Sequence, residues 1–236
     1  MAGFNFGTTA QPVNSQSYLR AWKIYDNVEF DGISGPQEGT SSNGNKWRKW
    51  EFTFKCKEGI YKESIFEPSA TDVDRVEVET SNGGKRMLPS RVETLNLIIQ
   101  QIVFVYMNDK NKAKFQQLAE SGKFNNIEFN KFIDILKKLL ENPKKPSENY
   151  PIQLKLQGRN NDGKVYAKLP NAAISTKDNS AWMERFLGSN LTMTPYEVQQ
   201  AKATTESKPT DMNSIDTPVQ NTEDLDELTK ELDNII

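Results

Sequence analysis

Residues Asn45 to Lys57 alternate between apolar and polar side chains, which is the pattern of a β-strand with one buried face. Successive side chains of a strand point to opposite faces, so the two sets separate. The apolar face, expected in the core, consists of Trp50, Phe52, Phe54 and Cys56. The other face consists of Trp47, Lys49, Glu51, Thr53, Lys55 and Lys57, with Arg48 beside them. A tryptophan ring among lysines suits either a solvated edge strand or a surface that binds a single-stranded nucleic acid.

Four further stretches carry strand patterns: Tyr18–Phe30, Ile60–Glu67, Tyr150–Gln157 and Lys164–Leu169. The alternation within Tyr18–Phe30 is imperfect, which predicts a bulge or a strong bend. Asp31–Asn45 holds four glycines and a proline, so a mobile loop is expected there. Arg159–Gly163 has the composition of a hairpin turn between the last two of these strands.

A helical period replaces the strand pattern after Ser69–Leu88, a charged segment that is expected to form a loop or hairpin. Ser90 and Glu93 have the spacing of a capping box, which predicts a helix from Ser90 to about Met107. Two more helices are expected over about 109–119 and 128–140. Their apolar stripes indicate core packing rather than a site. Residues 182–191 are expected to close the body as a last strand or a short helix.

The second hairpin repeats the combination of a ring and lysines. Lys164, Tyr166 and Lys168 share its outward face, and Lys155 points outward from the preceding strand. Because two separate strands carry this combination, a binding face becomes the better interpretation. Base stacking is predicted for Trp47 and Tyr166, with Trp22 or Tyr61 as further candidates. Phosphate pairing is predicted for Arg20, Arg48, Lys49, Lys55, Lys57, Lys155, Arg159, Lys164 and Lys168.

The net charge of −2 over 236 residues hides an asymmetry. Residues 206–236 hold nine acidic residues and two lysines, a balance of −7, which leaves +5 for residues 1–205. A basic body with an acidic tail suggests a polyanionic partner and an internal competitor for it; the alternative is a tail that only aids solubility. The hydrophobic content of 36% is low for this length, so part of the chain is expected to remain unpacked.

Several classes of function are excluded by composition. The chain has no histidine and one cysteine, Cys56, which removes His-based triads, zinc sites and intrachain disulfides. No nucleophile–base pair, phosphate loop or metal cluster is recognisable, so neither enzymatic activity nor a cofactor is expected. The N-terminal residues lack a signal-peptide pattern, and the longest apolar run, Ile102–Tyr106, is too short to span a bilayer. The protein is therefore expected in the cytoplasm, without a membrane partner.

The chain is expected to divide into a flexible arm over 1–17, one domain over 18–193, and a disordered linker and acidic tail over 194–236. The last segment, 222–236, has a narrow apolar seam on an acidic helix, which is suited to binding a partner's groove. The alternatives are a helix that folds onto its own body or that self-associates. The candidate partner-binding residues are Leu225, Leu228, Leu232, Ile235 and Ile236.

The expected architecture is α+β. Five short strands, with a helical insertion over about 89–142 before the last pair, fit a five-stranded OB-like Greek-key β-barrel. With its acidic tail, the chain resembles the single-stranded DNA-binding proteins of tailed phages and, more distantly, those of bacteria. The segments that carry this resemblance are Trp47–Lys57, Tyr61–Pro68, the hairpin Gly158–Pro170 and the tail.

The resemblance implies a protein that coats single-stranded DNA during phage replication, recombination and repair, in the host cytoplasm, with a tail that recruits replication partners. The tail ends in Asn234-Ile235-Ile236, unlike the acidic-Pro-Phe end of bacterial relatives, so a bacterial partner is not implied. The absence of histidine excludes the zinc subdomain of some phage relatives. One competing interpretation is a structural or assembly protein of a virion, for which polar loops and a flexible tail would serve equally well. Another is a recombination mediator that binds protein first and DNA second.

Overall fold

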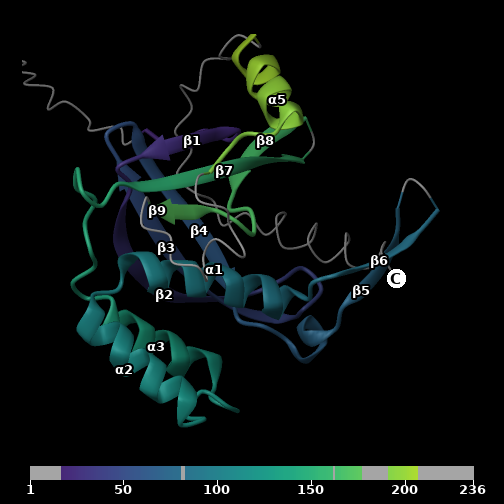
Figure 1. The fold of residues 1–236 in the computed structure, drawn as a ribbon. Helices are drawn as coiled ribbons and strands as arrows, with labels where there is room; N and C mark the ends of the chain where they lie inside the picture. The colour runs from purple at the N-terminus through teal and green to yellow at the C-terminus, as the bar shows by residue number, and fades with distance from the viewer. Residues whose placement is uncertain (1–16, 81–82, 162, 177–190, 207–236) are drawn as a thin grey trace, which may run out of the picture.

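The computed structural model describes residues 17–80, 83–161, 163–176 and 191–206 (Figure 1). These residues form a mixed α+β fold with four α-helices and several antiparallel sheets. The first sheet has the order β2 (Glu29–Thr40), β3 (Lys46–Cys56) and β4 (Gly59–Phe66). Trp50, Phe52 and Phe54 of β3 are buried, which confirms the predicted core face of this strand.

The second sheet contains the predicted hairpin of β7 (Ile152–Asn161) and β8 (Lys164–Lys168). Strands β1 (Lys23–Asp26) and β9 (Ile174–Thr176) both pair with β7. The chain leaves this sheet after β1 and enters the first sheet as β2, with Asn27 between them at φ 53°. This change of direction is the bend that the imperfect alternation predicted.

Helix α1 (Arg91–Tyr106) joins the two sheets into one core. The Tyr106 ring lies 5.5 Å from the Phe30 ring, and its hydroxyl donates to the Val28 carbonyl at 3.0 Å. Burial raises the pKa of Tyr106 well above its ordinary value. Seven residues of α1 that are apolar, from Leu95 to Tyr106, are buried, as the helical period predicted.

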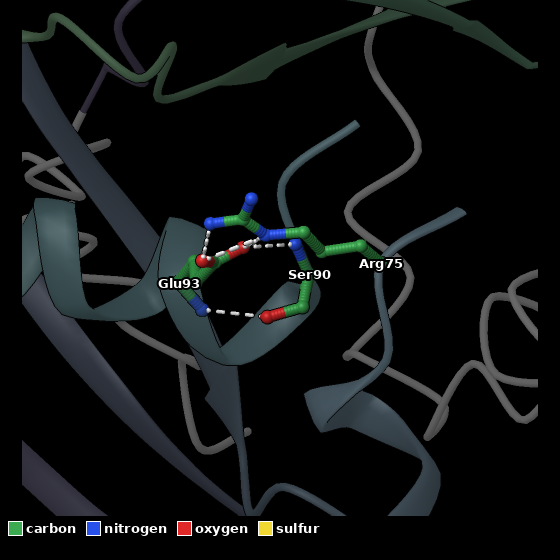
Figure 2. Close-up of polar contacts among 3 residues, drawn as sticks. All are labelled: Arg75, Ser90 and Glu93. Carbon is green, nitrogen blue, oxygen red and sulfur yellow. Dashed lines mark hydrogen bonds and ion pairs between the residues drawn. The ribbon is translucent and has the colours of Figure 1, made fainter. Parts of the chain in front are cut away.

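The predicted capping box begins α1 (Figure 2). The Ser90 hydroxyl accepts from the Glu93 amide at 3.1 Å, and the Glu93 carboxylate accepts from the Ser90 amide at 2.8 Å. Arg75 also donates to Glu93, so this carboxylate ties the helix start to the preceding segment. The Arg75 guanidinium, followed by the Ser90 amide, lowers the pKa of Glu93 to about 2.

The other two predicted helices are α2 (Asp109–Glu120) and α3 (Phe129–Leu139), which lie beside each other below the first sheet (Figure 1). Phe115, Phe124 and Phe132 pack together between them, with ring centroids 5.0–6.4 Å apart. The Phe129 ring lies 5.3 Å from Trp50 of β3, so the insertion packs against the first sheet.

The predicted loop over Asp31–Asn45 is wrong for most of its length, because β2 continues to Thr40. The pairing of β2 with β3 shifts register between Phe30 and Gly32 and again between Ser34 and Gln37. Gly32 and Gly35 have φ values of 113° and 99°, which glycine adopts readily, so these residues allow the two register shifts of the β2–β3 pair. A glycine-rich composition is compatible with such a strand as well as with a loop.

The segment between β4 and α1 is more ordered than a loop. It contains a 3-10 helix, η1 (Ala70–Val73), and a hairpin of β5 (Val76–Glu79) and β6 (Lys85–Leu88). This hairpin extends away from the two sheets (Figure 1).

The predicted linker begins instead with helix α5 (Pro195–Glu206). The Thr194 hydroxyl accepts from the Glu197 amide at 3.3 Å, and the Glu197 carboxylate accepts from the Thr194 amide at 2.7 Å. This capping pair starts the helix, although the sequence that follows is polar.

No continuous ladder of strands closes the sheets into a barrel within the described residues. In the same part of the chain, no helix is long and apolar enough to cross a membrane. Residues 1–16 of the predicted arm, residues 182–190 of the predicted closing element and residues 207–236 of the acidic tail lie outside the described residues.

Candidate nucleic-acid interface

A groove of about 1010 Å³ lies between the outer face of β3 and β4 and the β7–β8 hairpin, beside the first half of α1. We call this the groove throughout. It brings together residues that are about 100 positions apart in the sequence. Seven predicted site residues line it: Trp47, Lys49, Tyr61, Lys155, Arg159, Tyr166 and Lys168.

Two aromatic rings are presented from the two sides of the groove. Trp47 on β3 packs edge-on against Phe66 of β4, with ring centroids 6.0 Å apart. The Lys49 ammonium lies 5.9 Å from the Trp47 ring centroid. On β8, Tyr166 is 43% exposed and forms a cross-strand pair with Arg159 of β7. Each ring is therefore accompanied by a cation, as base and phosphate binding requires.

The charged residues that line the groove are mainly basic. The lining contains six lysines and arginines against two glutamates, Glu38 and Glu63. Lys49 and Lys62 share the carboxylate of Glu51, at 3.9 and 3.2 Å. Among the described residues, Lys168 has no carboxylate within ion-pair distance. A cleft with this excess of positive charge attracts polyanions.

Lys62, Phe66 and Arg91 line the groove but were not among the predicted site residues. Lys62 follows Tyr61 along β4 and therefore points to the opposite face, but the local pattern does not say which of the two faces outward. Arg91 is the first residue of α1, and its guanidinium lies 5.9 Å from the Phe66 ring centroid. No local pattern indicates that this helix start meets β4.

The prediction that Tyr61 stacks a base is wrong. Tyr61 is buried, and its ring stacks on Phe54 in the core at a centroid distance of 6.3 Å. Its hydroxyl donates to Glu63, which also accepts from the Leu169 amide at 3.4 Å. Burial raises the pKa of Tyr61, and burial likewise raises the pKa of Glu63. This pair links β4 to the end of β8 at the floor of the groove.

Lys155 was predicted to be outward and available, but it is only 8% exposed. Its ammonium pairs with Glu197 at 2.8 Å and donates to the Thr192 carbonyl at 2.8 Å. The alternation along β7 is correct, because Lys155 lines the groove together with Arg159. Residues in and just before α5 cover Lys155. The alternating pattern of a strand does not predict burial by a segment that lies elsewhere in the sequence.

Six predicted residues do not line the groove: Arg20, Trp22, Arg48, Lys55, Lys57 and Lys164. Lys55 pairs with Asp31 at 2.5 Å, and this hydrogen bond raises its pKa. Trp22 lies against Gly158 of β7 and contacts Tyr196 of α5 edge-on at 5.9 Å. These contacts place Trp22 in the packing of α5 rather than in the groove.

A second hollow of about 700 Å³ adjoins the groove, and Trp47, Phe66 and Arg91 line both. Arg48, a predicted phosphate-binding residue, lines this second hollow. It pairs with Glu38 at 2.7 Å and Glu67 at 3.4 Å, and the hydrogen bond to Glu38 raises its pKa. The two hollows thus form a longer path that crosses the Trp47 and Phe66 rings.

The five candidate partner-binding residues, Leu225, Leu228, Leu232, Ile235 and Ile236, lie outside the described residues. Comparison of the chain with protein-family models, curated proteins and solved structures finds no match.

Proposed function

We propose that this protein binds and coats single-stranded DNA, and that the groove is the binding site. The observation that carries this proposal is the meeting of two ring-and-cation pairs, Trp47 with Lys49 and Tyr166 with Arg159, in one basic groove. They come from strands of different sheets. Rings for bases and cations for phosphates are the two requirements of single-strand binding.

Trp47 and Tyr166 stack bases in this proposal, each contributing roughly 1–3 kcal/mol. Lys49, Lys62, Arg159 and Lys168 pair with the backbone phosphates. Each neutralised phosphate contributes about −0.7 to the slope of log affinity against log salt concentration. A duplex presents its bases already stacked on one another, so the rings favour a single strand.

An OB-like Greek-key barrel is the architecture that we propose around this groove. Its support is the order of pairing: the chain that forms β1 and β2 pairs with both β7 and β3, and a helix precedes β7. A closed barrel would also require β4 and β8 to lie next to each other, and no backbone ladder joins these two strands in the described residues. The Glu63 contact with Leu169, and a 3.5 Å contact of the Tyr61 hydroxyl with the Ala167 carbonyl, join these strands through side chains.

The wider role that we propose is coating of DNA during phage replication and recombination, without catalysis. The acidic residues of 206–236 and the apolar seam from Leu225 to Ile236 would recruit replication proteins. The alternative role, a virion assembly protein, requires no affinity for nucleic acid. Affinity for single strands therefore separates the two.

The test is a titration of fluorescein-labelled oligo-dT, followed by anisotropy at low and moderate salt, with a duplex of equal length as control. We expect salt-sensitive binding of the single strand and much weaker binding of the duplex. Trp47→Ala and Tyr166→Ala should each weaken binding at least several-fold. The matched control is Tyr18→Ala, whose ring is 68% exposed outside the groove. Absence of binding at low salt would favour the virion role.

A further inference from the structure

The carboxylate of Glu197 occupies an anion-binding position at one end of the groove. The Lys155 ammonium lies 2.8 Å from one of its oxygens, and the Gln157 amide donates to the other at 2.6 Å. Both donors belong to β7 and line the groove, whereas Glu197 belongs to α5. Glu197 is only 2% exposed, so α5 excludes water from this position.

Lys155 and Gln157 continue a row that leads into the groove. Alternate residues of a strand share a face and are about 6.8 Å apart, so Lys155, Gln157 and Arg159 form one line of donors along β7. Arg159 forms a cross-strand pair with Tyr166. A nucleic-acid backbone that follows this row past Tyr166 reaches the position of the Glu197 carboxylate.

Helix α5 has little apolar contact to hold it in place. Of its residues 195–204, Glu197 alone is buried, while Tyr196 is 61% and Val198 41% exposed. Tyr196 of α5 makes an edge contact with Trp22, which precedes β1. A helix of twelve residues is marginal without tertiary support, so α5 depends on the contacts of Glu197 with β7 to stay docked. Docking of α5 is thus a low-stability part of the fold.

We propose that Lys155 and Gln157 form a phosphate subsite of the groove, which Glu197 of α5 occupies until a single strand displaces it. This inference rests on the proposed function. A phosphate replaces the carboxylate as counterion of Lys155, and α5 leaves β7. Helix α5 therefore lowers the affinity for single strands and limits the length of strand contacted. Its release also frees the point at which residues 207–236 join the body.

The first test compares salt dependence of oligo-dT binding for the full chain and Glu197→Gln, which keeps the side-chain size and removes the charge. We expect tighter binding by the variant and a log–log salt slope that is steeper by about 0.7, the contribution of one phosphate. The matched control is the double variant Lys155→Gln with Glu197→Gln, in which both gains should disappear. Thermal unfolding of each variant verifies that the body remains folded.

The second test measures α5 directly through trypsin cleavage after Lys202, an exposed lysine within the helix. Cleavage inside a helix requires local unfolding, so its rate reports release of α5. Saturating oligo-dT should accelerate this cleavage in the unmodified protein. An unchanged rate, or an unchanged salt slope in Glu197→Gln while the unmodified protein binds oligo-dT, overturns this inference alone. Absence of binding by every form overturns the proposed function instead.

Discussion

Trp47 lies across Gly39, its directly paired neighbour on β2. A β-carbon at residue 39 would fall well inside van der Waals contact with the indole ring. The indole Nε1 is buried and has no hydrogen-bond partner among the described residues, so packing rather than polar contact holds the ring. The absence of a side chain at Gly39 therefore sets where Trp47 stands in the groove.

Replacement of Gly39 should displace the ring while leaving the strand pair intact. We expect Gly39→Ala to shift the tryptophan emission and to weaken oligo-dT binding several-fold, because the stacking surface of Trp47 moves. The matched control is Gly84→Ala in the β5–β6 hairpin, where an added β-carbon meets the Thr80 hydroxyl at 3.2 Å and no other atom of the described residues within 4 Å. Equal affinity for Gly39→Ala and the unmodified protein would show that the ring position is unimportant.

The faces of β3 were predictable because the period of a strand is fixed by its backbone. That rule separates Trp50 from Trp47 without knowledge of any partner strand. The same rule does not predict that a side chain on the outer face is buried by a segment from elsewhere in the sequence. Lys155 follows the rule and is nevertheless covered, since α5 packs on it from about 40 residues away.

Whether Tyr61 is buried or exposed depends on which face of β4 packs against the core. Tyr61 and Ile65 share one face, and either face of a short mixed strand is acceptable to a local pattern. In the structure Phe54 of β3 pairs with Tyr61 of β4, and this register places Tyr61 on the buried face, against the aromatic core. This information lies in strand register, which a single segment does not carry.

Tyr61→Phe tests the structural role of this tyrosine. The change removes the donor to Glu63, whose carboxylate lies in a site where burial already raises its pKa. Loss of one of the two donors to this partly buried carboxylate costs about 1 kcal/mol, so the free energy of unfolding in urea should fall by that amount. Oligo-dT affinity should stay unchanged at a temperature where the protein is folded. A loss of affinity without a loss of stability would return Tyr61 to the binding surface.

Ser90→Ala should destabilise the protein by about 1 kcal/mol, because the amide of Glu93 loses its acceptor at the start of α1. The measurement is urea denaturation followed by circular dichroism. Ser90→Thr serves as the matched control, since threonine keeps the hydroxyl and the cap. Equal losses for the two variants would mean that burial of Ser90, rather than capping, explains its effect.

Because of Glu197, the free energy of unfolding should decrease as the pH is lowered below about 4.5. Burial acts to raise its pKa, but hydrogen bonds from Lys155, the Thr194 amide and Gln157 outweigh burial and lower the pKa to about 2, from an ordinary value of 4.5. Because the pKa is lower in the folded state, this contribution to stability is complete above about pH 4.5 and is lost as the pH falls towards 2.

The measurement is the free energy of unfolding of the unmodified protein and of Glu197→Gln in urea, from pH 6 down to pH 2. Other carboxylates, including Glu93, titrate in both proteins, so their effect cancels in the difference. We expect the unmodified protein to be more stable at pH 6 and this advantage to shrink as acid protonates Glu197. A difference that is constant over the range would show that the carboxylate charge does not hold α5 on β7.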